Sequence, residues 1–342
     1  MDEKLHFADL PDRLLDWYAG AARDLPWRIG PGERAKGVTP DPYRVWLAEI
    51  MLQQTTVPHA TRYYLDFTQR WPRIEDLAGA DDEAVMAAWA GLGYYARARN
   101  LLKCARAVTA LGAWPETAKG LQDLPGIGPY TAGAIAALAF GQRAAAVDGN
   151  VDRVFARLMA LKGDWKAEKQ VLKSVVEDLV PADRPAEFAE ALMDLGATVC
   201  TPKSPNCLLC PLRDMCAAQK EGAPERYPIK PKKTPKPTRH GHVYVVLGED
   251  RTVLTERRPD RGLLGGMMGL PTSDWLDEAP DPKFPSQGNW ESVGEVRHVF
   301  THFALTLTVW RMTGKSSGEY KPVSKVVDGL PSAFAKALKL AL

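Results

Sequence analysis

Apolar residues recur every three or four positions through the first two thirds of the chain, which is the spacing of amphipathic helices. One helix start is clearly marked, because Asp41 is a good N-cap and Pro42 suits the first turn. We therefore expect an all-helical N-terminal part. The predicted helices span residues 10–21, 43–54, 60–71, 84–89, 97–111, 131–140, 151–161, 169–179 and 186–199.

The periodicity changes after residues 227–240, YPIKPKKTPKPTRH, where proline alternates with lysine and apolar residues are nearly absent. Such a segment disfavours both helix and buried strand, so we interpret it as an extended linker. The chain is thus predicted to be multidomain, with an all-α domain at 1–226 and an α+β domain at 241–342. Alternating apolar and polar or β-branched residues predict strands at 242–249, 252–258 and 304–312, and helical spacing returns at 332–342.

The composition is that of a soluble globular protein, since 45% of the 342 residues are hydrophobic and 25% are charged. No stretch approaches the roughly 20 apolar residues that a membrane helix needs. The first ten residues carry Asp2, Glu3 and Asp9 and no apolar run, so we expect no signal peptide and a cytoplasmic location. Disulfides would be rare in that reducing compartment.

The basic residues are distributed unevenly. The net charge of +2 does not by itself indicate a polyanionic partner. Between Cys200 and Arg239, however, nine lysines and arginines stand against three acidic residues. This local excess of positive charge suits the phosphate backbone of a nucleic acid.

Four of the five cysteines follow the pattern C-x6-C-x2-C-x5-C, namely Cys200, Cys207, Cys210 and Cys216. Zinc sites usually use two C-x2-C knuckles, whereas one close pair flanked by two single cysteines suits thiolates around an iron-sulfur cluster. The alternatives are disulfides or four unrelated buried cysteines. Cys104 lies in a helical run, where a core position is expected.

A glycine-rich turn precedes one of the predicted helices. In residues 124–133, LPGIGPYTAG, Gly126 and Gly128 form a tight turn before a helix that begins at Pro129. This resembles a helix-hairpin-helix, in which backbone N–H groups at a helix N-terminus hold a DNA phosphate. A G-x-G turn alone is weak evidence, because many such turns only connect two helices.

Two carboxylates are candidates for chemistry. Asp148, in VDGNV, stands at a helix start, where it is either a plain N-cap or an ionised group that stabilises a cation. Glu49, in VWLAEIMLQQT, is either at the surface boundary of its helix or faces a pocket, where burial would raise its pKa and let it act as a general acid. Two carboxylates of different proton affinity are typical of glycosidic bond cleavage.

Six motifs together resemble the MutY-type adenine DNA glycosylases of the endonuclease III superfamily. They are LPWR (25–28), AEIMLQQT (48–55), GLGYYARARNL (91–101), LPGIGPYTAG (124–133), VDGNVDRV (147–154) and the four-cysteine loop. The resemblance implies a helix-hairpin-helix at about 117–140, a [4Fe-4S] cluster in the loop 200–216, and a Nudix-like C-terminal domain. It also implies a monomer that acts on double-stranded DNA carrying adenine opposite 8-oxoguanine or guanine.

The same resemblance assigns roles to single residues. Glu49 would protonate the adenine, Asp148 would stabilise the resulting cation, and Asn150 and Tyr130 would orient Asp148 and the sugar. The flipped adenine would be surrounded by Leu25, Trp27, Arg28 and Glu190. The wedge and the recognition of the opposite base would come from Leu52, Gln53, Gln54, Tyr94, Phe300, Thr301 and His302. Gly126 and Gly128 would bind phosphate, and Cys200, Cys207, Cys210 and Cys216 would hold the cluster.

Two features separate the alternatives. Bifunctional relatives carry a lysine where this chain has Tyr130, so we expect base hydrolysis without strand cleavage. The C-terminal part contains GLLGGMMGLP but no acidic magnesium-binding Nudix box, so it should bind a base and not hydrolyse a nucleotide. A non-catalytic DNA-binding protein and a pyrimidine glycosylase are the competing hypotheses.

Residues 29–39, IGPGERAKGVT, look longer than in the family and are expected to form a surface loop.

Overall fold

The computed structural model describes residues 7–229, 235–259, 263–300, 302–327 and 329–342. Contacts between Cα atoms divide the chain into two compact units. The first unit holds Met1–Asp82 and Arg97–Lys232, and the second holds Glu83–Ala96 and Lys233–Leu342. Among the described residues, no helix combines the length and the apolar character needed to cross a membrane.

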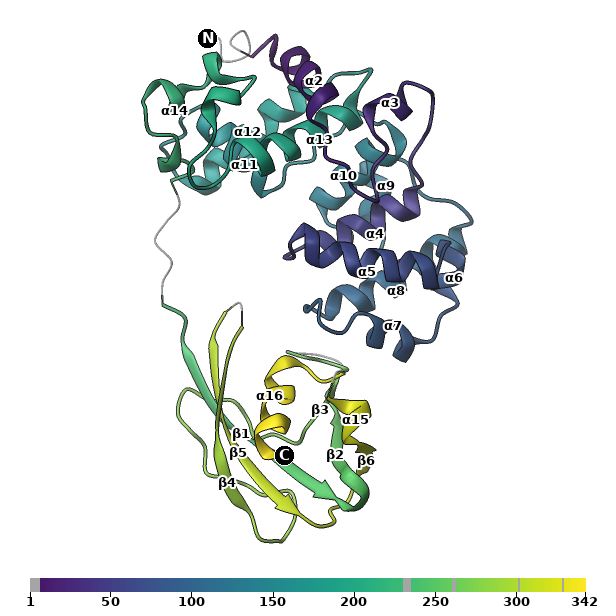
Figure 1. Cartoon of the computed structure of the whole chain (residues 1–342), viewed down its shortest axis with the longest axis vertical. Helices are drawn as coiled ribbons and strands as arrows, with labels where there is room; N and C mark the ends of the chain where they lie inside the picture. The colour runs from purple at the N-terminus through teal and green to yellow at the C-terminus, as the bar shows by residue number, and fades with distance from the viewer. Residues whose placement is uncertain (1–6, 230–234, 260–262, 301, 328) are drawn as a thin grey trace. The chain divides into compact units, whose positions relative to one another are not determined.

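The first unit is helical, as the apolar spacing predicts (Figure 1). Its helices are α2 (Leu10–Ala21), α3 (Pro31–Arg34), α4 (Pro42–Leu52), α5 (Val57–Arg70), α6 (Ile74–Ala78), α8 (Ala96–Leu111), α9 (Ala118–Gln122), α10 (Pro129–Phe140), α11 (Gly149–Leu158), α12 (Trp165–Leu179), α13 (Pro185–Asp194) and α14 (Ala217–Lys220). A π-helical turn, Leu195–Val199, continues α13 toward the first cysteine of the loop. The predicted start of α4 is confirmed, because the Asp41 side chain accepts a hydrogen bond from Tyr43 N (2.9 Å).

A buried apolar core joins the N-terminal helix to the last helices of this unit. Leu14 of α2, Phe155 of α11 and Phe188 of α13 belong to one cluster of buried side chains. Cys200, Cys210 and Cys216 pack against the same cluster from outside. The cysteine loop therefore lies on the core that also supports the start of α11.

The helix-hairpin-helix consists of α9, a short turn and α10. In the turn, Gly126 adopts a φ of 78°, and a Cβ added there would lie 2.6 Å from Asn100 Cβ. Any side chain would thus clash with α8 as well as strain the backbone. Gly128 is the N-cap of α10, and a Cβ at that position would meet open space. The predicted motif is confirmed, with α10 beginning at Pro129.

The second unit contains α7 (Asp82–Ala88) and a six-stranded sheet covered by a C-terminal helix. The elements are β1 (Thr238–Gly248), β2 (Thr252–Arg257), β3 (Met268–Gly269), β4 (Glu291–Val299), β5 (Ala304–Thr313), β6 (Glu319–Pro322), α15 (Val323–Val326) and α16 (Ser332–Ala341). The strand order is β3-β2-β1-β5-β4, with β6 paired to β2. Among the strand pairs of the described residues, β1 and β5 run parallel and the others run antiparallel. Side chains of α16, such as Phe334, share a buried core with β1 and β5.

The predicted α+β class of the second unit is confirmed, and two details differ from the expectation. β1 begins at Thr238, inside the segment expected to be linker, because Thr238 pairs with Ala304 and His240 with Thr306 of β5. At the other end of that segment, Tyr227 is buried against Ala156 and Ala218 of the first unit. Residues 230–234 lie outside the described part of the chain.

Candidate active site

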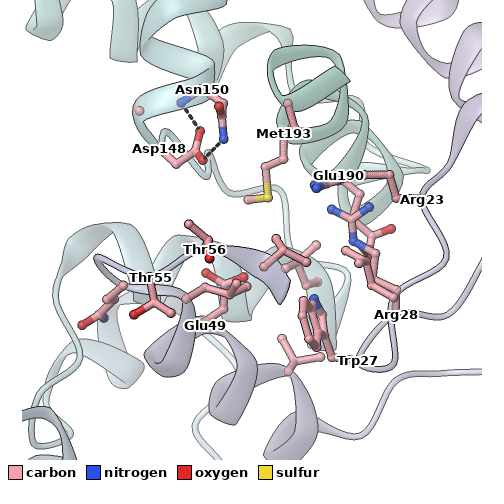
Figure 2. A pocket seen from close by; sticks show the side chains of 18 of the residues that line it. Arg23, Trp27, Arg28, Glu49, Thr55, Thr56, Asp148, Asn150, Glu190 and Met193 are labelled. Carbon is pink, nitrogen blue, oxygen red and sulfur yellow. Dashed lines mark hydrogen bonds and ion pairs between the residues drawn. The ribbon is translucent and has the colours of Figure 1, made fainter. Parts of the chain in front are cut away.

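One cavity of about 540 Å³ brings the predicted site residues of the first unit together (Figure 2). From the sequence we expected these residues to act in catalysis, in contact with adenine and as a wedge, and they come from five separate stretches of the chain. These residues are Leu25, Trp27, Arg28, Glu49, Leu52, Gln53, Gln54, Tyr130, Asp148, Asn150 and Glu190. Cavity residues without a prediction are Arg23, Arg34, Val45, Thr55, Thr56, Val57, Leu138, Gly149, Met193 and Ala197.

Glu49 faces the cavity from α4 and is almost completely buried, with 6% of its surface exposed. Burial raises its pKa from the ordinary 4.5 to about 7, and the charge of Asp148 adds to this rise. The hydrogen bond from Tyr130 and the charge of Arg28 act in the opposite direction. A carboxyl group of this kind carries a proton often enough near neutral pH to donate it to a base.

Tyr130 contacts the acid of the pair. It was expected, together with Asn150, to orient Asp148 and the sugar, which stays a prediction; in the structure its hydroxyl donates a hydrogen bond to Glu49 Oε2 at 3.0 Å. Burial first, and then the charge of Glu49, raise the pKa of Tyr130, so the hydroxyl keeps the proton that it donates. The side chain therefore positions the acid on α4.

Asp148 is the N-cap of α11, and its two oxygens accept three hydrogen bonds of 2.8 Å. The donors are Asn150 N and Val151 N to Oδ1, and Asn150 Nδ2 to Oδ2. The expected bond between Asn150 and Asp148 is thus present. The turn is tightly enclosed, because a Cβ on Gly196 would lie 2.5 Å from Asn150 Cβ. N–H donors and a helix N-terminus both suit a negatively charged carboxylate.

Glu49 and Asp148 lie on opposite walls of the same cavity, one on α4 and the other at the start of α11 (Figure 2). They are close enough for the charge of Asp148 to influence the pKa of Glu49. One carboxyl group is buried and protonatable, while the other is held by N–H donors. This is the division into an acid and an anion that glycosidic bond cleavage uses.

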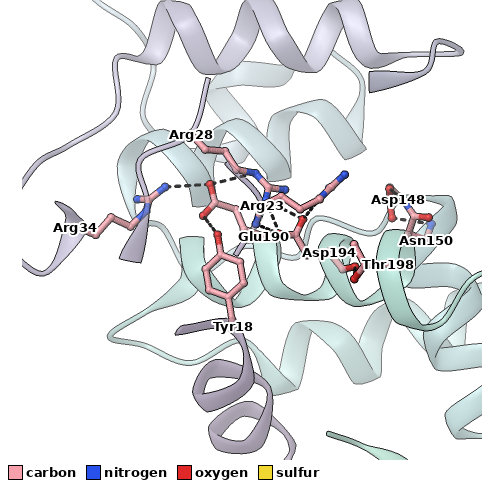
Figure 3. A network of polar contacts seen from close by, with 9 residues as sticks. All are labelled: Tyr18, Arg23, Arg28, Arg34, Asp148, Asn150, Glu190, Asp194 and Thr198. Carbon is pink, nitrogen blue, oxygen red and sulfur yellow. Dashed lines mark hydrogen bonds and ion pairs between the residues drawn. The ribbon is translucent and has the colours of Figure 1, made fainter. Parts of the chain in front are cut away.

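A second group of polar side chains forms a network in which Arg23, Arg28, Arg34 and Glu190 line the same cavity (Figure 3). Asp194, which is fully buried, binds Arg23 Nε at 2.7 Å and Arg28 Nη1 at 2.7 and 2.8 Å. Glu190 accepts hydrogen bonds from Tyr18 (2.9 Å) and Arg34 (3.2 Å). Arg23, Arg34 and Asp194 were not predicted as site residues from the sequence. The sequence pointed to Asp194 alone of these three, because it follows Glu190 by four residues and therefore lies on the same face of the helix.

The end of α4 and the loop after it carry the predicted wedge. Gln53 Nε2 donates to Thr131 Oγ1 at 3.2 Å, and Gln54 adopts a positive φ of 58°. Tyr94 belongs to the segment grouped with the second unit and is 51% exposed.

The predicted base-recognition loop lies in the second unit. There, Phe300 stacks on Trp275 with ring centroids 6.0 Å apart, and His302 is exposed. Thr301 lies outside the described residues.

The cysteine loop is suited to a cluster. Burial raises the pKa of the Cys210 thiol to about 12, and Cys200, Cys216 and Cys207 add to the rise, so the four sulfur atoms lie within electrostatic range. Deprotonating such thiols requires a compensating positive charge, which the iron of a cluster supplies. The buried Arg157 also reaches this loop, donating to Cys200 Sγ (3.2 Å) and Thr201 O (2.7 Å).

The described residues contain no group of three or more His, Cys, Asp or Glu side chains placed to hold a metal ion. Ligands of a cluster stand further apart than ligands of a single ion, because iron and sulfide atoms fill the centre.

The buried state of Glu49 predicts a pH-dependent cost in stability. A pKa raised from 4.5 to about 7 means that the folded chain keeps a proton that the unfolded chain releases in this window. The stability that comes from keeping Glu49 protonated in the folded chain is therefore fully present below pH 4.5, and it is lost as the pH rises through 7. Glu49→Gln should raise the free energy of unfolding above neutral pH, by up to about 3 kcal/mol. Urea unfolding of both chains at about pH 5.5 and about pH 8.5 measures this, and a gain that does not grow with pH would contradict it.

Comparisons with known proteins first define the class. Residues 47–181 match the model of the HhH-GPD superfamily base excision DNA repair proteins. Residues 200–216 match the iron-sulfur binding domain of endonuclease III, and residues 242–340 match a NUDIX domain. A solved thermostable thymine-DNA glycosylase superposes with a TM-score of 0.56 at 30% identity, covering 65% of this chain and all of that one. An endonuclease III–DNA complex shares the fold, with a TM-score of 0.53 at 23% identity over 65% of this chain and 99% of that one.

Curated relatives then define the family. The adenine DNA glycosylase of Homo sapiens is 35% identical over 92% of this chain and 68% of its own length. That of Buchnera aphidicola subsp. Acyrthosiphon pisum is 36% identical over 85% of this chain and 83% of its own length. The chain belongs to the adenine DNA glycosylase family. The predicted Nudix-like domain and the [4Fe-4S] cluster are thereby confirmed. The matched residues 200–216 contain the four cysteines that are predicted to be its ligands.

Proposed function

We propose that the chain is a monofunctional adenine DNA glycosylase that removes adenine from mispairs with 8-oxoguanine or guanine and leaves an abasic site. The observation that carries this proposal is the pair of carboxyl groups in one cavity, Glu49 with its raised pKa and Asp148 with its three N–H donors. The cavity, at about 540 Å³, falls within the range of about 300–1,000 Å³ that is usual for small-ligand sites.

Adenine inside a duplex is out of reach, so the nucleotide must be flipped out at a cost of a few kcal/mol. Leu52, Gln53 and Gln54, at the end of α4, would fill the space that the base leaves. Backbone N–H groups at Gly126 and Gly128 would bind a phosphate at the N-terminus of α10. The flipped base would then enter the cavity between Trp27, Arg28 and Glu190.

Bond cleavage begins with proton transfer. Glu49 donates its proton to adenine N7, which turns the base into a better leaving group. The bond between N9 and the sugar carbon C1′ then breaks, and its electron pair stays with the departing adenine. An oxocarbenium ion remains on the sugar, and the carboxylate of Asp148 stabilises it or briefly bonds to it. Asn150 holds Asp148 in place through its side-chain hydrogen bond.

Water completes the reaction. Glu49, now a carboxylate, accepts a proton from a water molecule whose oxygen bonds to C1′. This returns Glu49 to its protonated form and produces the abasic sugar. Tyr130 stands where a Schiff-base amine would be needed for strand cleavage, and it carries none. The iron-sulfur loop takes no part in these steps.

Recognition of the opposite base would involve Tyr94, Phe300, Thr301 and His302. A stacked aromatic pair such as Phe300 and Trp275 offers a platform on the second unit for an oxidised purine. The alternative functions differ in substrate: a pyrimidine glycosylase would act on an oxidised pyrimidine, and a non-catalytic DNA-binding protein would act on none.

Single-turnover excision separates these functions. We expect base release from duplexes with adenine opposite 8-oxoguanine, slower release opposite guanine, and none from a duplex with an oxidised pyrimidine. Strands should break only after added alkali. Release of the pyrimidine would favour the pyrimidine glycosylase, and strand breakage without alkali would contradict the monofunctional mechanism.

A further inference from the structure

Residues 29–39, expected to form a surface loop without a role, fold into a compact turn that sends one side chain into the cavity. Gly30 O accepts hydrogen bonds from Glu33 N and Arg34 N, both at 3.0 Å, and Val38 N donates back to Glu33 O at 3.1 Å. These bonds build the single-turn helix α3. Lys36 points to solvent, whereas the Arg34 side chain is only 14% exposed and lines the cavity.

Arg34 is directed at Glu190. Its Nη2 donates to Glu190 Oε1 at 3.2 Å, and its Nε donates to Ile29 O at 3.1 Å (Figure 3). The second bond fixes the plane of the guanidinium within the insertion itself. The Glu190 side chain is 3% exposed, and its other oxygen accepts from Tyr18 at 2.9 Å. A carboxylate this deeply buried needs a cation beside it to remain charged.

The other two arginines of the network hydrogen-bond to Asp194. Arg23 binds it through its side chain and its backbone N–H, and Arg28 Nη1 binds both carboxylate oxygens. Arg28 Nε also forms an ion pair with Glu190 Oε1, but at 3.9 Å it lies beyond hydrogen-bond distance (Figure 3). In the part of the chain that the structure describes, Arg34 is thus the guanidinium that hydrogen-bonds Glu190.

We propose that Arg34 is a positioning residue whose hydrogen bond holds Glu190 in place as the acceptor for the exocyclic amino group of the flipped adenine. This inference rests on the proposed function. A carboxylate offers about four lone-pair sites, of which Tyr18 and Arg34 each occupy one. The remaining sites can accept from an amine in the cavity. An insertion at the rim thereby contributes to the preference for adenine over purines that lack the amino group.

The test compares two substrates that differ only in that group, adenine and unsubstituted purine, each opposite 8-oxoguanine. We expect Arg34→Met to slow single-turnover excision of adenine about tenfold, the loss of one hydrogen bond to a charged group. Excision of purine should stay unchanged, because purine donates nothing to Glu190. Arg34→Lys keeps the charge and should restore most of the adenine rate. Lys36→Met, from the exposed side of the same insertion, is the matched control.

Several outcomes would overturn the inference. Equal losses for adenine and purine in Arg34→Met would show a structural role alone, and thermal unfolding of each variant identifies a chain that has lost its fold. Arg34→Lys gives a second test if Arg34→Met fails to fold. If Arg34→Lys excised adenine as slowly as Arg34→Met, the positive charge at position 34 would have no role in excision. A parent chain that removes purine as fast as adenine also contradicts it. A parent chain that removes neither base contradicts the proposed function itself.

Discussion

Glu49→Gln should slow the single-turnover excision of adenine by about 10³-fold, within the range that general acid–base catalysis contributes. Glutamine keeps the size of the side chain and an oxygen that can accept the hydrogen bond from Tyr130 Oη. It has no proton to give to adenine N7 and no carboxylate to take one from water. Affinity for the mispaired duplex should therefore stay within about threefold of the parent, or about 0.7 kcal/mol.

Glu177→Gln is the matched control for this variant. Glu177 is exposed on α12, pairs with Lys173 and is not among the residues that line the cavity. Its excision rate should equal that of the parent. Substantial turnover by the Glu49→Gln chain would remove Glu49 from the mechanism, and a parallel loss of duplex binding would point to a structural defect.

Asp148→Asn should slow excision by about 10²–10³-fold, the usual effect of removing one electrostatic stabiliser of a transition state. Asparagine is as good an N-cap as aspartate, so α11 should still begin at Gly149. What is lost is the negative charge that faces the oxocarbenium ion. Rates are measured as for Glu49, and circular dichroism shows whether the helices persist.

Asp164→Asn makes the same chemical change at another N-cap. Asp164 is the N-cap of α12 and accepts hydrogen bonds from Lys166 N and Ala167 N. It is not among the residues that line the cavity. The control chain should excise adenine at the parental rate. If both N-cap variants were equally slow, the effect of Asp148→Asn would come from the helix start and not from a charge beside the sugar.

Local signals were sufficient for most of the helical unit. Asp41 and Pro42 marked the start of α4, and the apolar spacing of residues 10–21 matched α2 (Leu10–Ala21). Neither feature depends on distant parts of the chain. β4 was not predicted, because ESVGEVRHV is polar and contains a glycine. It becomes a strand by pairing with β5 along its length, an interaction that a local pattern does not reveal.

The candidate site was also predicted only as far as local patterns allow. Motifs around Glu49 and Asp148 predicted that both residues belong to one site, and the structure places both on one cavity. The hydrogen bond from Tyr130 to Glu49 was not predicted, because it depends on how α10 packs against α4. Arg34 was missed for a related reason: ERAKG is a typical exposed turn, and only the folded insertion directs its arginine at Glu190.

Whether Glu49 protonates an extruded adenine is tested by a crystal structure of the Asp148→Asn chain bound to a duplex with adenine opposite 8-oxoguanine. We expect the adenine to lie outside the helix stack, with N7 at about 2.6–3.2 Å from a Glu49 carboxyl oxygen. The sugar carbon C1′ should face residue 148. An adenine that remains stacked in the duplex, or one that enters the cavity with N7 turned away from Glu49, would contradict the account.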